Sequence, residues 1–283
     1  MGTYLRPGGL DEALDALAAG VRGGRPPVVV AGATDHFPAR VGRVVDEDVV
    51  DVSGLEDARA VRRRGAGWLI PSGATWTDIA EGDLPPLFDG LRLAARAIGG
   101  RQIQNRATVV GNICNASPAA DGVPNLLALH VVVELASRRG RREVPIASFV
   151  TGNRATVRAA DELVTGLFIP EPGDAAHSTF LKLGSRAYLV ISIAMVAAVL
   201  VTDAHRRVTS ARIAVGACSA VAARLPELEQ LLNGRAASPG IEDLVQTGHL
   251  ASLAPIDDVR GSAAYRLEAA EVLVRRALAE LVA

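Results

Sequence analysis

In the first 135 residues, the spacing of apolar positions predicts alternating helices and short buried strands. Helices are expected over residues 10–19, 87–98 and 124–129, the first two ending at glycines. Apolar runs predict strands over residues 28–30, 49–52, 68–70 and 131–135. Thr75 is placed to cap a further short helix. The segment 101–121, polar and rich in small residues, is expected to be a long ordered loop.

The pattern changes beyond residues 171–174, a predicted linker. Apolar runs over residues 179–183, 191–201 and 208–215 predict strands of an antiparallel sheet. Helices are predicted over residues 225–232 and 262–282, the second one amphipathic. The apolar stretch 189–201 is interrupted only by Ser192 and is too short to span a bilayer. The whole pattern predicts an α+β fold in two domains.

Composition and charge narrow the possible functions. The chain has 283 residues, of which 49% are hydrophobic and 22% charged, with a formal net charge of −1. This composition is typical of a globular protein. A net charge near zero gives no positive electrostatic potential that would attract nucleic acid or an anionic membrane. Cys114 and Cys218 are too few to hold an iron–sulfur cluster and have no metal-ligand spacing. The N-terminal residues lack the apolar core of a signal peptide, so we expect a cytoplasmic protein without membrane insertion.

Two loops built from small residues are candidates for phosphate binding. They are Ala31–His36, after a predicted strand, and Thr108–Asn112. Small residues allow main-chain N–H groups to surround a phosphate. Neither loop is a Rossmann GxGxxG or a Walker A motif, and each taken alone is more typical of a tight turn after a strand.

The surrounding residues resemble one family. QIQNRATVVGN at 102–112 and NASPAAD at 115–121 resemble the QIRNxGTIGGNxxxASPAAD signature of the flavin subunits of molybdenum hydroxylases, the xanthine and carbon monoxide dehydrogenase type. VAGATD at 30–35 resembles that family's AGGTD loop, and IPSGAT at 70–75 its IGAxxT turn. FLKLGSR at 180–186 resembles the opening of its C-terminal domain.

The resemblance implies a fold, a cofactor and partners. Residues 1–172 would form an FAD-binding domain of the vanillyl-alcohol-oxidase/MurB (PCMH) type, with subdomains of about 1–54 and 55–172. Residues 176–283 would form a small α+β domain of the CO dehydrogenase flavoprotein type. The chain would be an oxidoreductase subunit that passes electrons through FAD to NAD, quinone or oxygen. Its partners would be a molybdopterin-containing large subunit and a small [2Fe–2S] subunit.

The resemblance also assigns cofactor contacts, with no catalytic residue and no metal ligand in this chain. The two loops would hold the pyrophosphate and ribityl chain, Asp121 would accept a hydrogen bond from a hydroxyl of FAD, and Ile98 and Val164 would be apolar contacts. Lys182 would lie near the isoalloxazine ring, where a cation favours the reduced flavin. The loop residues concerned are Val29, Val30, Ala31, Gly32, Ala33, Thr34, Asp35, His36, Thr108, Val109, Val110, Gly111 and Asn112.

Several residues keep a second interpretation. Asp121 is also placed to be a helix N-cap, and Lys182 to be a charged residue that protects an edge strand. His36 is assigned backbone contact only. Tyr188 is favoured as a packed strand aromatic over one that stacks on the flavin.

Two positions depart from the family pattern, because Ala33 and Val110 replace glycines. Valine resists positive φ, so Val110 predicts backbone strain and weaker FAD binding, whereas alanine at position 33 is a mild change.

Two other functions remain open. One is a stand-alone FAD-dependent dehydrogenase or oxidase of a small molecule on the same fold. The other is a non-catalytic interaction protein that has lost FAD.

Overall fold

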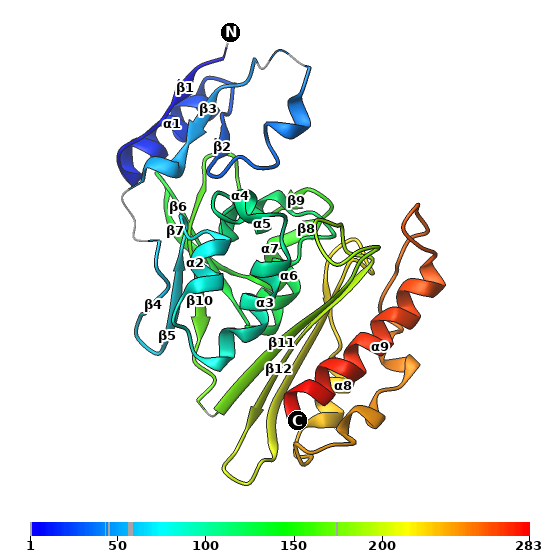
Figure 1. The fold of residues 1–283 in the computed structure, drawn as a ribbon. Helices are drawn as coiled ribbons and strands as arrows, with labels where there is room; N and C mark the ends of the chain where they lie inside the picture. Colours follow the sequence, from blue (N-terminus) through cyan, green and yellow to red (C-terminus); the bar gives the residue numbers. More distant parts are fainter. Residues whose placement is uncertain (1, 43, 45, 56–58, 174) are drawn as a thin grey trace.

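The computed structural model describes residues 2–42, 44, 46–55, 59–173 and 175–283. It has the predicted α+β architecture, with three principal sheets that follow one another along the chain (Figure 1). The candidate loops lie where the first two sheets meet, and the C-terminal sheet packs beneath them (Figure 1).

The N-terminal lobe is a small parallel sheet covered by one helix. The strand order is β1 (Tyr4–Leu5), β3 (Val49–Asp51) and β2 (Val28–Val30), and the helix is α1 (Leu10–Arg22). The predicted end of this helix at Gly20 is wrong, because α1 continues to Arg22. Gly20 lies inside the helix, and a Cβ at this position would lie 2.4 Å from Cδ of Pro27, so there is no room for a side chain. This glycine permits close packing and does not end the helix.

The second lobe is a five-stranded antiparallel sheet with helices packed on it. Its order is β4 (Arg62–Arg63), β5 (Gly67–Pro71), β10 (Leu163–Pro170), β6 (Val132–Ser137) and β7 (Gly140–Pro145). The main helices are α2 (Trp76–Glu81), α3 (Asp89–Ala97) and α6 (Gly122–Ala128). The smaller elements are α7 (Ile146–Phe149), the hairpin β8 (Val150–Gly152) and β9 (Ala155–Thr156), and the 3-10 turns Pro38–Arg40, Val52–Gly54 and Pro86–Phe88.

The expectation of a long loop over residues 101–121 is wrong. The segment contains two short helices, α4 (Arg101–Gln104) and α5 (Val109–Asn115). Thr108 begins α5, because its side-chain oxygen accepts a hydrogen bond from the Gly111 amide at 2.9 Å. Helices this short have too little apolar periodicity to be recognised in a sequence.

The C-terminal domain is a four-stranded antiparallel sheet with two helices on one face. The strands run in the order β11 (Ala175–Leu183), β12 (Ala194–Thr202), β13 (Val208–Gly216) and β14 (Ala223–Arg224), and the helices are α8 (Pro226–Leu232) and α9 (Ala263–Val282). Short 3-10 turns at Ile241–Leu244 and Thr247–Leu250 lie between the helices. Residues 191–193, predicted to be strand, belong instead to the loop that leads into β12.

Strand β12 is buried on both faces. Met195 and Val199 pack into the core shared with α3 and α6, while Val196 and Leu200 face α8 and α9. A strand buried on both faces reads as a continuous apolar run, which explains the unbroken pattern here. The two domains therefore share one hydrophobic core across the predicted linker.

A buried hydroxyl reinforces this junction. The Ser178 hydroxyl donates to the carbonyl of Leu87 at 2.7 Å and accepts from the amide of Gly90 at 2.8 Å. Strand β11 is thereby tied to the start of α3, about ninety residues earlier in the chain. Its contacts are with main-chain atoms of the second lobe.

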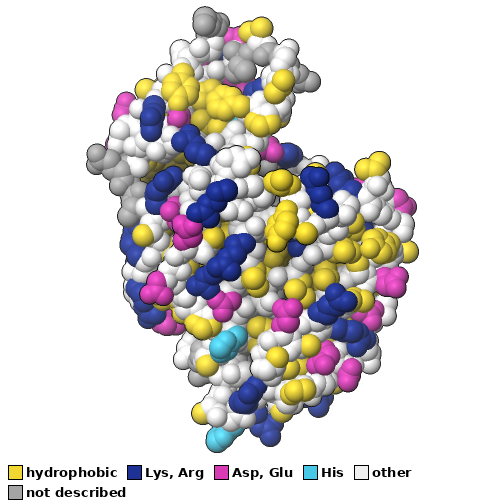
Figure 2. All heavy atoms as spheres, in the orientation of Figure 1, with side chains coloured by type: hydrophobic (Ala, Val, Ile, Leu, Met, Phe, Trp, Pro, Cys, Tyr) yellow, Lys and Arg dark blue, Asp and Glu magenta, His cyan; other side chains and the backbone are white. Residues whose placement is uncertain are grey.

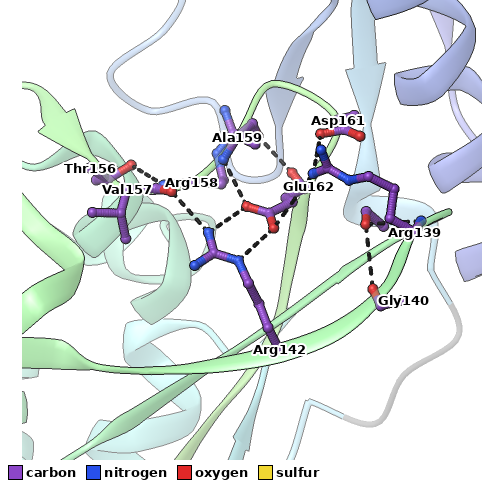
Figure 3. A network of polar contacts seen from close by, with 10 residues as sticks. Arg139, Gly140, Arg142, Thr156, Val157, Arg158, Ala159, Asp161 and Glu162 are labelled. Carbon is purple, nitrogen blue, oxygen red and sulfur yellow. Dashed lines mark hydrogen bonds and ion pairs between the residues drawn. The ribbon is translucent and has the colours of Figure 1, made fainter.

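The basic residues at 138–142 form the turn of the β6–β7 hairpin and the start of β7. Figure 3 shows its arginines in ion pairs: Arg142 binds both oxygens of Glu162 at 2.6 and 2.7 Å, and Arg139 contacts Asp161 at 2.9 Å. The hydrogen bond from Arg142 lowers the pKa of the Glu162 carboxyl. Acidic and basic side chains are also interspersed over the face seen in Figure 2. Among the described residues, the helices are too short or too polar to cross a membrane.

Candidate functional site

The first candidate loop leaves the N-terminal lobe at the end of β2. Val30 is buried, and the chain then turns through Ala31–His36 toward the second lobe. A Cβ on Gly32 would lie 1.9 Å from the Arg106 carbonyl oxygen and 2.9 Å from the Ala107 amide nitrogen. Only glycine permits this contact, so the first loop lies directly against the backbone that precedes the second.

The second candidate loop is held by the turn between β5 and α2. The Val109 amide donates to the Ala74 carbonyl at 3.0 Å, and the Trp76 amide donates to the Ala107 carbonyl at 3.1 Å. Thr75 caps α2, as predicted, through a reciprocal pair of hydrogen bonds with Asp78. The three segments that carry the family resemblance in this half of the chain therefore meet in space.

Arg154 joins the first loop to the C-terminal end of α5, just beyond the second loop, and was not predicted from the sequence. Its guanidinium donates to the Asp35 carboxylate at 2.6 Å and also contacts the Asn115 side chain. Its backbone amide donates to the Ala116 carbonyl at 2.8 Å. No local pattern in the sequence marks Arg154 for this contact, because only tertiary packing brings the turn of the β8–β9 hairpin next to Asp35 and Asn115.

Two buried polar atoms in these loops have no hydrogen-bond partner. They are Nε2 of His36 and Oδ1 of Asn112, and Nε of Arg266 is the one other such atom among the described residues. The His36 side chain is 9% exposed and its Nε2 lies 3.9 Å from Oε2 of Glu47, too far for a hydrogen bond, and burial lowers the pKa of the imidazole. Because unsatisfied buried polar groups are rare and costly, their presence in both loops fits a site that a polar cofactor completes.

Asp121 lies at the junction of the two domains, where its carboxylate accepts two hydrogen bonds. Oδ2 is 2.6 Å from the Lys182 ammonium nitrogen, and Oδ1 is 2.6 Å from the Ser192 hydroxyl. Asp121 and Ser192 are buried, and the Lys182 side chain is 13% exposed. Burial raises the pKa of Asp121, while the ammonium and the hydroxyl both favour its ionised form.

This geometry settles two alternative interpretations. Asp121 occupies the N-cap position of α6, as predicted, but its side chain makes no capping hydrogen bond. Lys182 does lie on the edge strand β11, but its ammonium is paired across the domain junction. It is therefore not a solvated charge that protects the edge.

A groove of about 410 Å³ opens beside Lys182. Leu93 and Ala97 of α3 line one side, and residues 180–184 with Arg186 and Ala187 line the other. The Lys182 side chain thus belongs both to the wall of the groove and to the ion pair with Asp121.

The remaining predicted contacts lie in different surroundings. Ile98 ends α3 and is partly buried beside the core, whereas Val164 is 1% exposed within it. Their contact with a cofactor stays a prediction, and Val164 has little free surface to offer. Tyr188 is 73% exposed in the loop after β11, so its interpretation as a packed strand aromatic is wrong.

The strain expected at Val110 is not present. Val110 lies inside α5 with its side chain 7% exposed in the core, and its φ is not positive. The replaced glycine that does require a left-handed backbone is at position 33, where alanine has a φ of +55°. The strain predicted at Val110 is therefore at Ala33 instead, because helix α5 was not anticipated.

Comparison with known proteins places these features in context. The family described as the FAD binding domain in molybdopterin dehydrogenase matches residues 1–172, and the CO dehydrogenase flavoprotein C-terminal domain matches residues 179–281. The chain is 30% identical to the nicotine 6-hydroxylase medium subunit of Paenarthrobacter nicotinovorans, over 98% of this chain and 96% of that subunit.

Two further similarities agree with the first. The chain is 29% identical to the xanthine dehydrogenase FAD-binding subunit of Escherichia coli O157:H7, over 83% of this chain and 81% of that one. Among solved structures, the CO dehydrogenase of Oligotropha carboxidovorans superposes with a TM-score of 0.88 at 25% identity, covering 100% of this chain and 98% of its counterpart.

The close contact at Gly32 leads to the first prediction. Gly32→Ala should weaken FAD binding at least tenfold, about 1.4 kcal/mol, because the added methyl group forces the two loops apart. Fluorescence titration of the apoprotein with FAD measures the effect. Gly73→Ala is the matched control, since a Cβ there meets its nearest atom at 3.8 Å. Equal affinity in both variants would show that the Gly32 contact does not shape the site.

The second prediction reverses the one made for Val110 from sequence. Val110→Gly should lower the free energy of unfolding by roughly 2–4 kcal/mol, because it removes a buried side chain and places glycine in a helix. Ala33→Gly should instead raise it, by up to about 1 kcal/mol, by relieving the left-handed strain. Urea unfolding of both apoproteins checks the two signs. A Val110→Gly variant as stable as its parent, with tighter FAD binding, would restore the original interpretation.

Proposed function

Because the chain belongs to the family of FAD-binding subunits of molybdenum hydroxylase-type dehydrogenases, we propose that it carries electrons from an iron–sulfur subunit through FAD to a final acceptor, NAD, quinone or oxygen. The resemblance recognised in the sequence is confirmed, and so are FAD as cofactor and the assignment to an oxidoreductase. The route of the electrons and the identity of the partners are the proposal.

The observation that carries the proposal is that each loop buries one polar atom without a hydrogen-bond partner. His36 and Asn112 each bury a polar atom at a cost that a bound FAD would offset. We propose that Ala31–His36 and Thr108–Asn112 hold the pyrophosphate and ribityl chain, and that the isoalloxazine ring lies toward Lys182. Bound FAD would supply the ability to accept two electrons and to release them.

This chain's own residues would then bind and orient the cofactor. Gly32 keeps the first loop against the backbone that precedes the second, Arg154 ties the first loop to the end of α5, and the Lys182 ammonium supplies positive charge at the groove. Because Lys182 is paired with Asp121, it acts on the groove as one end of an ion pair. The expectation from sequence, a cation near the isoalloxazine ring, did not include this ion pair.

The need for partner subunits is supported by the cysteines. Burial raises the pKa of both Cys114 and Cys218 to about 11, so both thiols stay protonated at neutral pH. Whatever their protonation, two cysteines are too few to ligate an iron–sulfur cluster. Relatives are named as medium subunits, which implies further subunits in their complexes. We propose that this chain joins a large molybdopterin subunit and a small [2Fe–2S] subunit.

Asn112 offers a direct test of the cofactor site. Asn112→Leu should weaken FAD binding about tenfold while leaving the apoprotein as stable as its parent or more so, because it removes an unsatisfied buried oxygen. Asn125→Leu is the matched control, since the Asn125 amide donates to the Asp121 carbonyl at 3.0 Å and its loss should destabilise the fold. Unchanged FAD affinity in Asn112→Leu would remove Asn112 from the site.

The partner requirement is tested by purification from the native host. A tag on this chain should retrieve a molybdopterin-containing chain and a small iron–sulfur chain, detected by metal analysis and mass spectrometry. The isolated, FAD-loaded chain should not be reduced by the organic substrate that reduces the complex. Rapid reduction of the isolated chain would favour the stand-alone dehydrogenase.

A further inference from the structure

Ser192 is the one polar residue in the apolar stretch 189–201, and its hydroxyl is buried. It donates to Oδ1 of Asp121 at 2.6 Å, while Lys182 occupies Oδ2 of the same carboxylate. A buried hydroxyl with a charged partner forms a stronger hydrogen bond than one with a neutral partner. The Ser192 side chain is therefore placed where it acts on the charge of Asp121.

The backbone beside Ser192 is held by a second ion pair. Arg266 of α9 is 3% exposed and donates to the Ile193 carbonyl at 2.6 Å and to the Asp258 carboxylate at 2.6 Å. A hydrogen bond from the Arg260 amide and the adjacent Arg266 guanidinium hold the pKa of Asp258 at about 2. The position of Ser192 is thus set by the body of the C-terminal domain.

Asp121 consequently lies between two donors from different parts of the C-terminal domain. One is on β11 and lines the groove, and the other precedes β12 and is remote from solvent. With both oxygens engaged, the carboxylate cannot rotate without breaking a hydrogen bond. The direction in which the Lys182 ammonium lies is then fixed by Asp121, and the orientation of Asp121 is fixed by Ser192.

We propose that Ser192 is a positioning residue for the flavin: it orients Asp121 so that the Asp121–Lys182 ion pair presents its positive end to the isoalloxazine ring in the groove. This inference rests on the function proposed above, in which Lys182 lies next to the ring. Reduced flavin is richer in electrons than oxidised flavin, so the local charge sets the relative affinity for the two forms.

The proposal gives opposite signs for two substitutions. Ser192→Ala removes the donor to Oδ1, and the less stabilised carboxylate charge then disfavours the reduced flavin. The midpoint potential of bound FAD should fall. Asp121→Asn removes the negative charge and leaves the Lys182 ammonium uncompensated, so the midpoint potential should rise. A tenfold change in the ratio of the two affinities corresponds to about 30 mV for a two-electron couple.

Ser178→Ala is the matched control. Ser178 is also a buried serine at the domain junction, but its hydroxyl bonds only to main-chain atoms, those of Pro86, Leu87 and Gly90. It should lower thermal stability without moving the potential. Ser192→Cys keeps the side chain close to its original size and replaces the hydroxyl with a weak donor, so it separates the hydrogen bond from packing. It should shift the potential in the same direction as Ser192→Ala.

The measurement is a dithionite titration of each FAD-loaded protein against a reference dye, together with the FAD dissociation constant and the melting temperature. A lower potential in both Ser192 variants, a higher one in Asp121→Asn, and no shift in Ser178→Ala support the proposal. Equal midpoint potentials in the Ser192 and Ser178 variants would overturn the role of Ser192 without contradicting FAD binding. Failure of the parent protein to bind FAD would instead overturn the proposed function.

Discussion

Burial of both faces of β12 is the constraint on which the candidate site depends. Because one face packs against helices of the second lobe and the other against α8 and α9, the C-terminal domain has one position relative to the FAD-binding domain. That position brings Lys182 and Ser192 to Asp121, sixty or more residues earlier in the chain. A charge buried at such a junction is tolerated only with partners, and here the other domain provides both.

The two candidate loops follow a different principle, because a missing side chain and missing hydrogen bonds define them. Gly32 lacks a side chain where the backbone of residues 106–107 passes, and His36 and Asn112 lack hydrogen-bond partners for buried atoms. The close contact holds the first loop against the backbone that precedes the second. The unsatisfied buried atoms are a local cost that a polar ligand can remove. The unsatisfied atoms lower the stability of the apoprotein, and a ligand that forms hydrogen bonds with them would bind more tightly for that reason.

Much of the fold was predictable, and the errors share a cause. Strands such as β2 and β5 and the long helix α9 were recognised because their apolar pattern is strong and their ends are marked. The short helices α4 and α5 were missed because four to seven residues carry little periodicity. Gly20 was taken as a helix end, although its role is close packing against Pro27. Local patterns report local structure, whereas these features depend on contacts with distant segments.

The sequence by itself determined the α+β class, the family, the FAD cofactor and the two loops that carry its motifs. It also showed one polar residue, Ser192, in an apolar stretch, and physical chemistry required that it find a partner. Only the tertiary structure decided that this partner is Asp121, and that the strained position of the loops is Ala33 and not Val110. The reason is that a hydrogen-bond partner and a backbone dihedral are selected by packing between segments far apart in the chain, which no local pattern records.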